Sequence, residues 1–117
     1  MSKLVIDNTT IINAPGKGVT HSTSTLASGF TGTIHWTVFN GICIVSLAGV
    51  TPSSTGGGKT VYTSLPKCGQ YAAVTTADNS NAFYINYNTT TLLANINTLV
   101  AQTLQIVYPV ASDWEES

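Results

Sequence analysis

The chain has 117 residues, enough for one domain of ordinary size and too few for two. About 43% of the residues are hydrophobic, but only 8% are charged, against roughly 25% in an average soluble domain, and the net charge is -1. Thr, Ser and Asn supply the polar character and together make up a third of the chain. Four Lys and no Arg are too few for sequence-independent binding of nucleic acid. The sequence has no apolar run of about 18 residues, the length that would predict insertion into a membrane.

The first 28 residues predict an N-terminal arm or edge strands. Residues 4–6 and 11–12 are apolar and suit short strands or an arm that pairs with a neighbour, and residues 14–18 form a turn cluster. Residues 21–28 are small and polar, which indicates a loop or a weak edge strand. Asp7 follows only three apolar residues, so we expect no secretory signal peptide.

The clearest predicted element is a β-hairpin formed by residues 32–39 and 42–48. Hydrophobic and polar side chains alternate along the first of these strands, which places Trp36 on the apolar side and His35 on the other. We therefore expect Trp36 in the core and His35 as a half-buried strand residue. Asn40-Gly41 between two such runs predicts a type I′ turn, because both turn residues need a positive φ.

The rest of the chain shows the same strand pattern, and no helix of useful length can be read from it. Seven or eight short strands at intervals of roughly 8–12 residues favour an all-β, antiparallel β-sandwich, jelly-roll-like or Greek-key. This head covers residues 29–111 and is followed by an acidic tail over residues 112–117. A loop is expected at residues 50–59 and a turn at residues 78–81, and the later strands are predicted at residues 60–63, 71–75, 82–87, 91–96 and 103–110.

The low charge also predicts self-association. A monomer so poor in charge would expose much Thr, Ser and apolar surface, and its sheet edges would have few Lys residues to block pairing with other strands. Burial in a symmetric oligomer would remove that surface from water.

No arrangement of residues in the chain predicts catalysis. The five carboxylates do not form an evident pair, and residues 54–60 lack the first Gly and the following helix of a phosphate-binding loop. Cys43 and Cys68 with two His do not match a zinc site. They are expected to be two thiols, at least one of them buried, with a single disulfide as the alternative. We therefore predict no enzyme, no catalytic residue, no cofactor and no metal.

Binding of a saccharide fits the composition better. Aromatic rings stack on the apolar faces of sugars, while Asn, Asp and hydroxyl groups bond to sugar hydroxyls. The predicted receptor-binding residues are Asp78, Asn79, Asn81, Tyr84 and Tyr87. A structural role remains open for three of these residues. Asp78 could instead hydrogen-bond to the backbone of its own turn. Tyr84 and Tyr87, expected on opposite faces of one strand, could include a core or interface residue.

Six features follow one another between residues 32 and 110. They are a Trp strand with its Asn-Gly hairpin (36–42), a small apolar strand (45–50), a Gly-rich loop (55–59), a Leu-Pro corner (63–67), an Asp/Asn turn (78–81) and a last hydrophobic strand (104–110). This order resembles the C-terminal receptor-binding head domains of phage tail fibres and baseplate receptor-binding proteins. The resemblance covers about two-thirds of the chain and lies in order and spacing.

The resemblance implies a homotrimer that binds saccharides of the bacterial cell envelope, often between protomers, without catalysis or a cofactor. It also implies a place in the virion, at the tail tip or fibre, with other tail or capsid proteins as partners and synthesis in the host cytoplasm. Such heads usually end a longer chain, so we expect either a fragment or a short virion protein. The alternatives are a trimeric structural or decoration protein that binds only virion proteins, and a carbohydrate-binding module.

Overall fold

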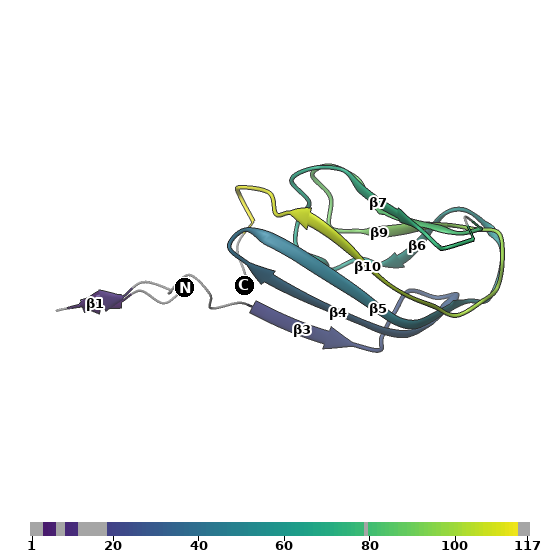
Figure 1. Cartoon of the computed structure of the whole chain (residues 1–117), viewed down its shortest axis with the longest axis horizontal. Coiled ribbons are helices and arrows are strands. Elements are labelled where there is room, and N and C mark those ends of the chain that lie inside the picture. Colours follow the sequence, from purple (N-terminus) through teal and green to yellow (C-terminus); the bar gives the residue numbers. More distant parts are fainter. Residues whose placement is uncertain (1–3, 7–8, 12–18, 79, 115–117) are drawn as a thin grey trace.

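The computed structural model describes the backbone of residues 4–6, 9–11, 19–78 and 80–114, and within these ranges the side chains from residue 19 onward. The described residues form strands and no helix, and they therefore contain no candidate membrane-spanning helix (Figure 1). The strands are β1 (Leu4–Ile6), β2 (Thr9–Ile11), β3 (Val19–Thr23), β4 (Phe30–Phe39), β5 (Ile42–Pro52), β6 (Gly56–Tyr62), β7 (Ala72–Thr75), β8 (Ala82–Ile85), β9 (Leu92–Ile96) and β10 (Gln102–Pro109).

Two antiparallel four-stranded sheets pack against each other. The first sheet has the order β10-β5-β4-β3 and the second the order β6-β9-β8-β7. Among the described residues β1 pairs with β2 alone, and this pair lies apart from both sheets in Figure 1. Alternate residues of the strands in these two sheets point between the sheets and form one continuous core. The prediction of an all-β, antiparallel fold is confirmed. The fully buried members of the core include Ile34, Cys43, Val45, Leu47, Val50, Val61, Leu65, Phe83, Ile85, Leu92, Ile96 and Tyr108.

The chain path explains how the two sheets are joined. β3, β4 and β5 form consecutive hairpins, the chain then crosses to the second sheet, and β10 returns to pair with β5. In the second sheet, β7, β8 and β9 are consecutive and β9 lies beside β6, which is the Greek-key order with its long connection first.

The hairpin between β4 and β5 has the predicted geometry. Asn40 and Gly41 have φ values of 53° and 79°, the positive values that a type I′ turn requires. Phe39 pairs with Ile42 across this turn, so the register follows directly from the two-residue loop. Trp36 is buried, and His35 on the opposite face is half-buried, as predicted.

One predicted edge strand is present, and one predicted loop is shorter than expected. β3 lies within residues 1–28, the range predicted as an arm or edge strands, and it is the edge strand of the first sheet, which therefore begins at Val19. The loop predicted over residues 50–59 is short, because β5 continues to Pro52 and β6 begins at Gly56. Pairing with β9 makes this Gly-rich segment part of the sheet, with a register shift between Gly56 and Lys59 and a φ of 62° at Gly58, although glycine is intrinsically unfavourable in a strand.

The start of the predicted acidic tail packs against the head. Trp114 contacts Trp36 edge to face, with 6.3 Å between ring centroids, and His21 stacks on Trp36 at 4.5 Å. Lys67 Nζ pairs with Asp113 Oδ2 at 2.9 Å. The described residues 112–114 are thus part of the packed structure, and residues 115–117 lie outside the described residues.

Candidate functional site

The predicted turn at residues 78–81 is held mainly by its own Asp. Asp78 Oδ1 accepts hydrogen bonds from Ser80 Oγ at 2.6 Å, Thr76 Oγ1 at 2.8 Å and the Ser80 backbone N–H at 3.0 Å. These bonds lower the pKa of the Asp78 carboxyl to about 2, and the bond from the Ser80 hydroxyl has the largest effect. Asp78 therefore has the structural role that the sequence left open, and its Oδ2 is the oxygen that a ligand could reach.

Asn81 fastens this turn to the chain that leaves β9. Its side chain is buried; Nδ2 donates to the Thr98 carbonyl at 3.0 Å, and Oδ1 accepts from the N–H groups of Asn97 and Thr98 at 2.7 and 3.0 Å. A side chain with this burial and these bonds offers nothing to a ligand, so we leave Asn81 out of the contact surface. The prediction for Asn79 lies outside the described residues.

Tyr84 and Tyr71 form an aromatic pair on the outer face of the second sheet. Their ring centroids are 6.4 Å apart, and the rings are tilted by 41°. Tyr84 is half-buried beside Gly58, where an added Cβ would lie 3.8 Å from its hydroxyl oxygen, and Tyr71 is exposed. The pair can offer ring faces to a ligand that lies on this sheet.

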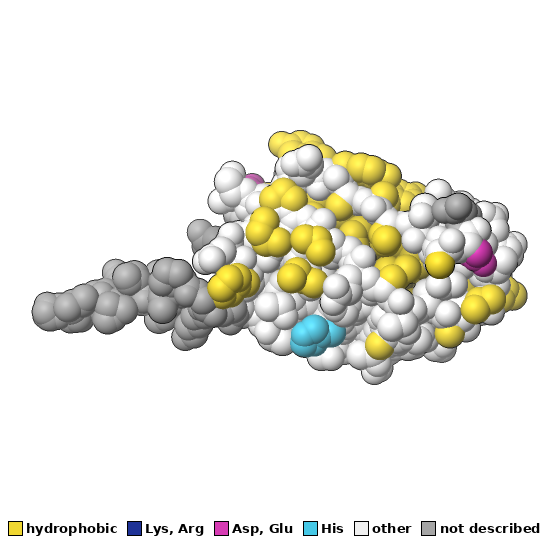
Figure 2. Space-filling view, viewed as in Figure 1, with side chains coloured by type: hydrophobic (Ala, Val, Ile, Leu, Met, Phe, Trp, Pro, Cys, Tyr) yellow, Lys and Arg dark blue, Asp and Glu magenta, His cyan; other side chains and the backbone are white. Residues whose placement is uncertain are grey.

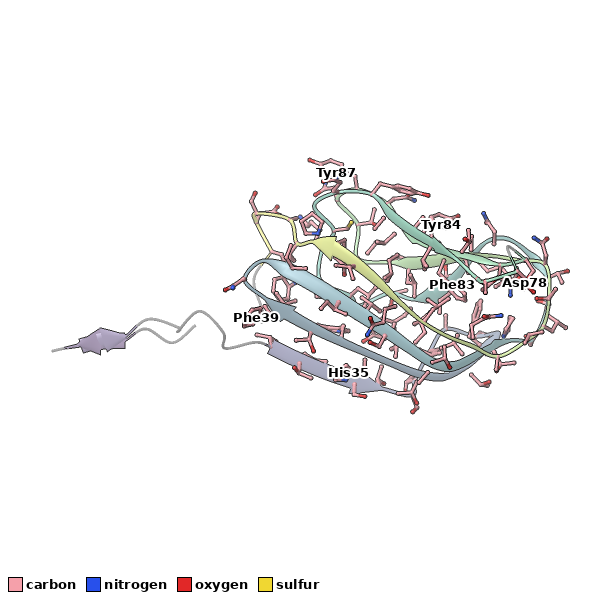
Figure 3. The ribbon with its side chains drawn as sticks, in the orientation of Figure 1. His35, Phe39, Asp78, Phe83, Tyr84 and Tyr87 are labelled. Carbon is pink, nitrogen blue, oxygen red and sulfur yellow. The ribbon has the colours of Figure 1, made fainter. Side chains whose placement is uncertain are left out.

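Tyr87 lies apart from the other predicted residues. Figure 3 shows Tyr87 and Asp78 toward opposite ends of the second sheet, with Tyr84 between them. Because β8 ends at Ile85, the alternation of faces does not continue to Tyr87, and its side chain is 67% exposed. Neither tyrosine is in the core. The predicted residues therefore do not converge on one site.

Tyr87 borders a hollow of about 390 Å³, here called the tyrosine hollow. Its polar groups include Asn88, Ser112 and Asp113, and the remaining lining residues are Gly69, Pro109, Val110 and Ala111. The hydrogen bond from Lys67 is the main cause that lowers the pKa of Asp113, so the one carboxylate among these lining residues is already paired with a lysine.

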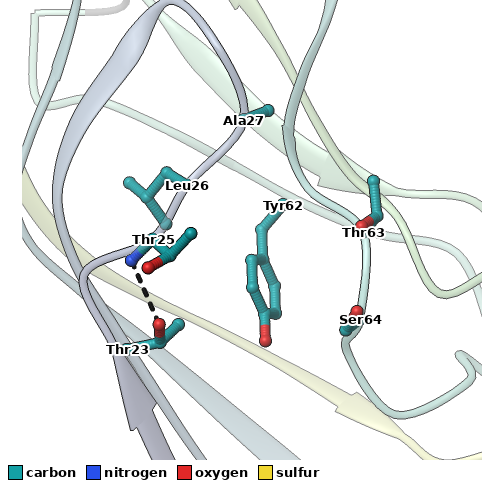
Figure 4. A pocket seen from close by; sticks show the side chains of 7 residues that line it. All are labelled: Thr23, Thr25, Leu26, Ala27, Tyr62, Thr63 and Ser64. Carbon is teal, nitrogen blue, oxygen red and sulfur yellow. Dashed lines mark hydrogen bonds between the residues drawn. The ribbon is translucent and has the colours of Figure 1, made fainter.

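A second hollow, of about 400 Å³, was not foreseen from the sequence. Figure 4 shows the Tyr62 ring between two walls, one after β3 and the other at the end of β6. We call it the hydroxyl hollow; it is lined by Thr23, Thr25, Leu26, Ala27, Tyr62, Thr63 and Ser64. Its two walls are about 40 positions apart in the chain, and no local pattern could have shown that they meet.

The outer face of the first sheet carries an apolar patch, defined by Phe39, Ile42, Ile44 and Val107. Their exposed fractions are 42%, 40%, 39% and 53%. The register places Phe39 opposite Ile42, and Ile44 opposite Val107, so the four side chains lie together. Figure 2 shows hydrophobic side chains gathered on this face, and no Lys or Arg among the described residues visible there.

The whole first sheet is free of formal charge. β3, β4, β5 and β10 contain no Asp, Glu, Lys or Arg. Beyond the patch the outer face becomes polar but neutral, with Thr37, His35, Ser46 and Gln105, and Gln105 Nε2 donates to Ser46 Oγ at 3.0 Å. This face therefore has an apolar part and an uncharged polar margin.

The two cysteines are free and buried, as the thiol interpretation predicted. Burial raises the pKa of Cys43 to about 11 and also raises the pKa of Cys68. Both thiols are therefore protonated near neutral pH, and neither is an activated nucleophile. Among the described residues no three His, Cys, Asp or Glu side chains lie close enough to hold a metal ion.

Comparisons of the chain with protein-family models, with curated proteins and with solved structures find no match. The surfaces of this chain that could carry a function are the uncharged sheet face, the two hollows and the tyrosine pair.

Proposed function

We propose that this chain is a non-enzymatic virion protein, the homotrimeric receptor-binding head of a phage tail tip or fibre, and that it recognises a saccharide of the bacterial cell envelope. The observation that carries the proposal is the charge-free first sheet with the apolar patch on its outer face. The resemblance in sequence order supplies the phage context and the trimer. The structure adds a surface suited to assembly and two hollows suited to small ligands.

The chemistry of the outer face supports burial between copies. Protein interfaces are depleted of charge at their centre and are bordered by a polar rim, and the apolar patch with its Thr, His, Ser and Gln margin follows this pattern. Natural sheets that remain exposed usually block their edges with charges, Lys above all. β3, an edge strand, has no such charge. A monomer with this composition would have low solubility, and burial of the sheet in an oligomer would remove that problem.

The binding surfaces support a weak, multivalent adhesin. Each protomer offers tyrosine rings, hydroxyls and amides that suit sugar recognition, distributed over separate places on the head. A trimer would present every site three times, and a particle would present many trimers. Effective concentration then converts weak single-site affinity into firm attachment.

The apolar patch also favours a second candidate, a trimeric structural or decoration protein that binds only other virion proteins. A face of this kind supports assembly whatever the particle uses the protein for. The two candidates differ in one property, because only the adhesin binds saccharide. A carbohydrate-binding module acting as a monomer would leave the apolar patch in water.

The experiment that tests the proposal is binding of the purified, full-length protein to an array of bacterial envelope saccharides, comprising O-antigens, capsular polysaccharides and teichoic acids. We expect selective binding to a small group of these saccharides, and weaker retention when the protein is diluted below its assembly range. An assembled protein that binds none of them contradicts the adhesin and favours the structural candidate.

A further inference from the structure

The hydroxyl hollow combines an aromatic ring with uncharged hydrogen-bonding groups. Five of its seven lining residues carry a hydroxyl group, and none carries a charge. The other two, Leu26 and Ala27, make one wall partly apolar. Figure 4 shows the Tyr62 ring lying between the walls.

Most of these hydroxyls are available to a ligand. Thr23 Oγ1 accepts a hydrogen bond from the Thr25 backbone N–H at 3.0 Å and can still donate one. Within the described part of the chain, the hydroxyls of Thr25, Tyr62, Thr63 and Ser64 make no hydrogen bond to protein. Up to five hydroxyl groups can therefore turn toward an occupant of the hollow.

The backbone holds both walls in place. The Ala27 N–H donates to the Val61 carbonyl at 2.8 Å, which ties the segment after β3 to β6. On the other side, Thr90 Oγ1 donates to the Thr63 carbonyl at 2.9 Å, and the N–H of the buried Leu65 donates to the Thr90 carbonyl at 3.0 Å. A hollow with walls fixed in this way does not have to be ordered by its ligand, which reduces the free-energy cost of binding.

The size and chemistry define the class of ligand. A hollow of about 400 Å³ lies within the ordinary range of small-molecule sites, roughly 300–1,000 Å³. An aromatic face beside several neutral hydroxyls complements a molecule that is apolar on one side and hydroxylated at its edge. The absence of charge from the lining residues disfavours carboxylated ligands, since a buried carboxylate needs a partner.

We propose that the hydroxyl hollow is a binding site for a neutral hexopyranose unit, which stacks on Tyr62 and is hydrogen-bonded by the hydroxyls of residues 23, 25, 63 and 64. This assignment rests on the proposed function, because it identifies where the adhesin holds its saccharide. It places recognition at residues outside the set predicted from the sequence. It also distinguishes this hollow from the tyrosine hollow, whose lining includes the carboxylate of Asp113 that pairs with Lys67.

The test uses the full-length protein and methyl glycosides of glucose, galactose and mannose, with methyl glucuronide as the charged probe. Binding is measured by the NMR shifts of backbone amides. We expect at least one neutral glycoside to shift residues 23–27 and 62–64, and the glucuronide to bind at least tenfold more weakly. The double variant Thr63→Val with Ser64→Ala removes two hydroxyl groups from the lining of the hollow and leaves the backbone as it is. It should weaken neutral-sugar binding at least tenfold.

Two matched variants serve as controls. Thr60→Val removes an exposed hydroxyl from β6 outside the hollow, and Tyr87→Ala removes the ring of the tyrosine hollow. Both should bind the neutral glycoside as the wild type does. If the saccharide array gives binding that Thr63→Val with Ser64→Ala leaves unchanged, or if Tyr87→Ala abolishes it, the hydroxyl hollow is the wrong site while the adhesin stands. If the wild type binds neither array nor glycosides, both proposals fail.

Discussion

A lysine in place of Ile44 should dissociate the assembly without unfolding the head. Ile44 lies in the apolar patch beside Val107 and points away from the core, so its replacement removes few contacts inside the protomer. The first sheet contains no carboxylate that could pair with the new ammonium group. The variant Ile44→Lys thus separates assembly from folding.

The size of the effect follows from exposure. Complete burial of an Ile side chain is worth about 1.5–3 kcal/mol, so burial of the 39% of Ile44 that is exposed contributes about 1 kcal/mol to assembly. Desolvation of an unpaired lysine adds a cost of at least about 2 kcal/mol, even if the side chain reaches partly toward water. The sum is about 3 kcal/mol at each interface, which corresponds to roughly 100-fold weaker association.

Analytical ultracentrifugation over a concentration series measures the association, and chemical denaturation measures the stability of the dissociated protomer. Thr60→Lys, on the exposed side of β6 in the second sheet, is the matched control and should leave association unchanged. Equal association by Ile44→Lys and the wild type would refute the assignment of this face to the interface.

Three further outcomes test the fold and the turn. Gly32→Ala should lose more than about 2 kcal/mol of unfolding free energy, because φ is 123° and the added Cβ would lie 2.6 Å from a β5 carbonyl oxygen; Gly57→Ala, with its nearest atom at 3.5 Å, should be close to neutral, and equal stabilities would contradict this. Tyr108→Phe should lose about 1–2 kcal/mol in the same denaturation assay, because it leaves the Pro66 carbonyl, now bonded at 2.8 Å, without its buried donor; an unchanged midpoint would contradict that role. Asp78 has a folded pKa below its unfolded value of 3.8, so its contribution to the free energy of unfolding is complete above pH 3.8 and is lost as the pH falls through about 2. NMR titration of its carboxyl carbon should give a midpoint near 2, and a midpoint near 3.8 would show that the turn bonds are absent.

The parts of the fold that local chemistry determines could be predicted from the sequence. The β4–β5 hairpin needs only alternation on either side of Asn40-Gly41, and both its turn and its buried face agree with the structure. The Gly-rich start of β6 could not be predicted, because its place in a strand depends on pairing with β9, more than 30 residues later. The Asn95 side chain accepts from the Gly58 N–H at 2.8 Å and helps to hold this segment in place.

The candidate site shows the same division between local and long-range information. The sequence identified Asp78 as a turn residue and offered its self-bonded form as an alternative, which the structure shows. It could not show that Asn81 is buried, since its partners lie 16 and 17 positions further along the chain. The hydroxyl hollow is the clearest case, because Thr25 and Thr63 become neighbours only when the two sheets pack.

The mass of the protein in solution, measured by light scattering on a sizing column, tests most directly the claim that the charge-free first sheet is buried between copies. We expect a mass three times that of the 12.3 kDa chain. A monomer at all accessible concentrations would contradict it, because the apolar patch would then remain in water.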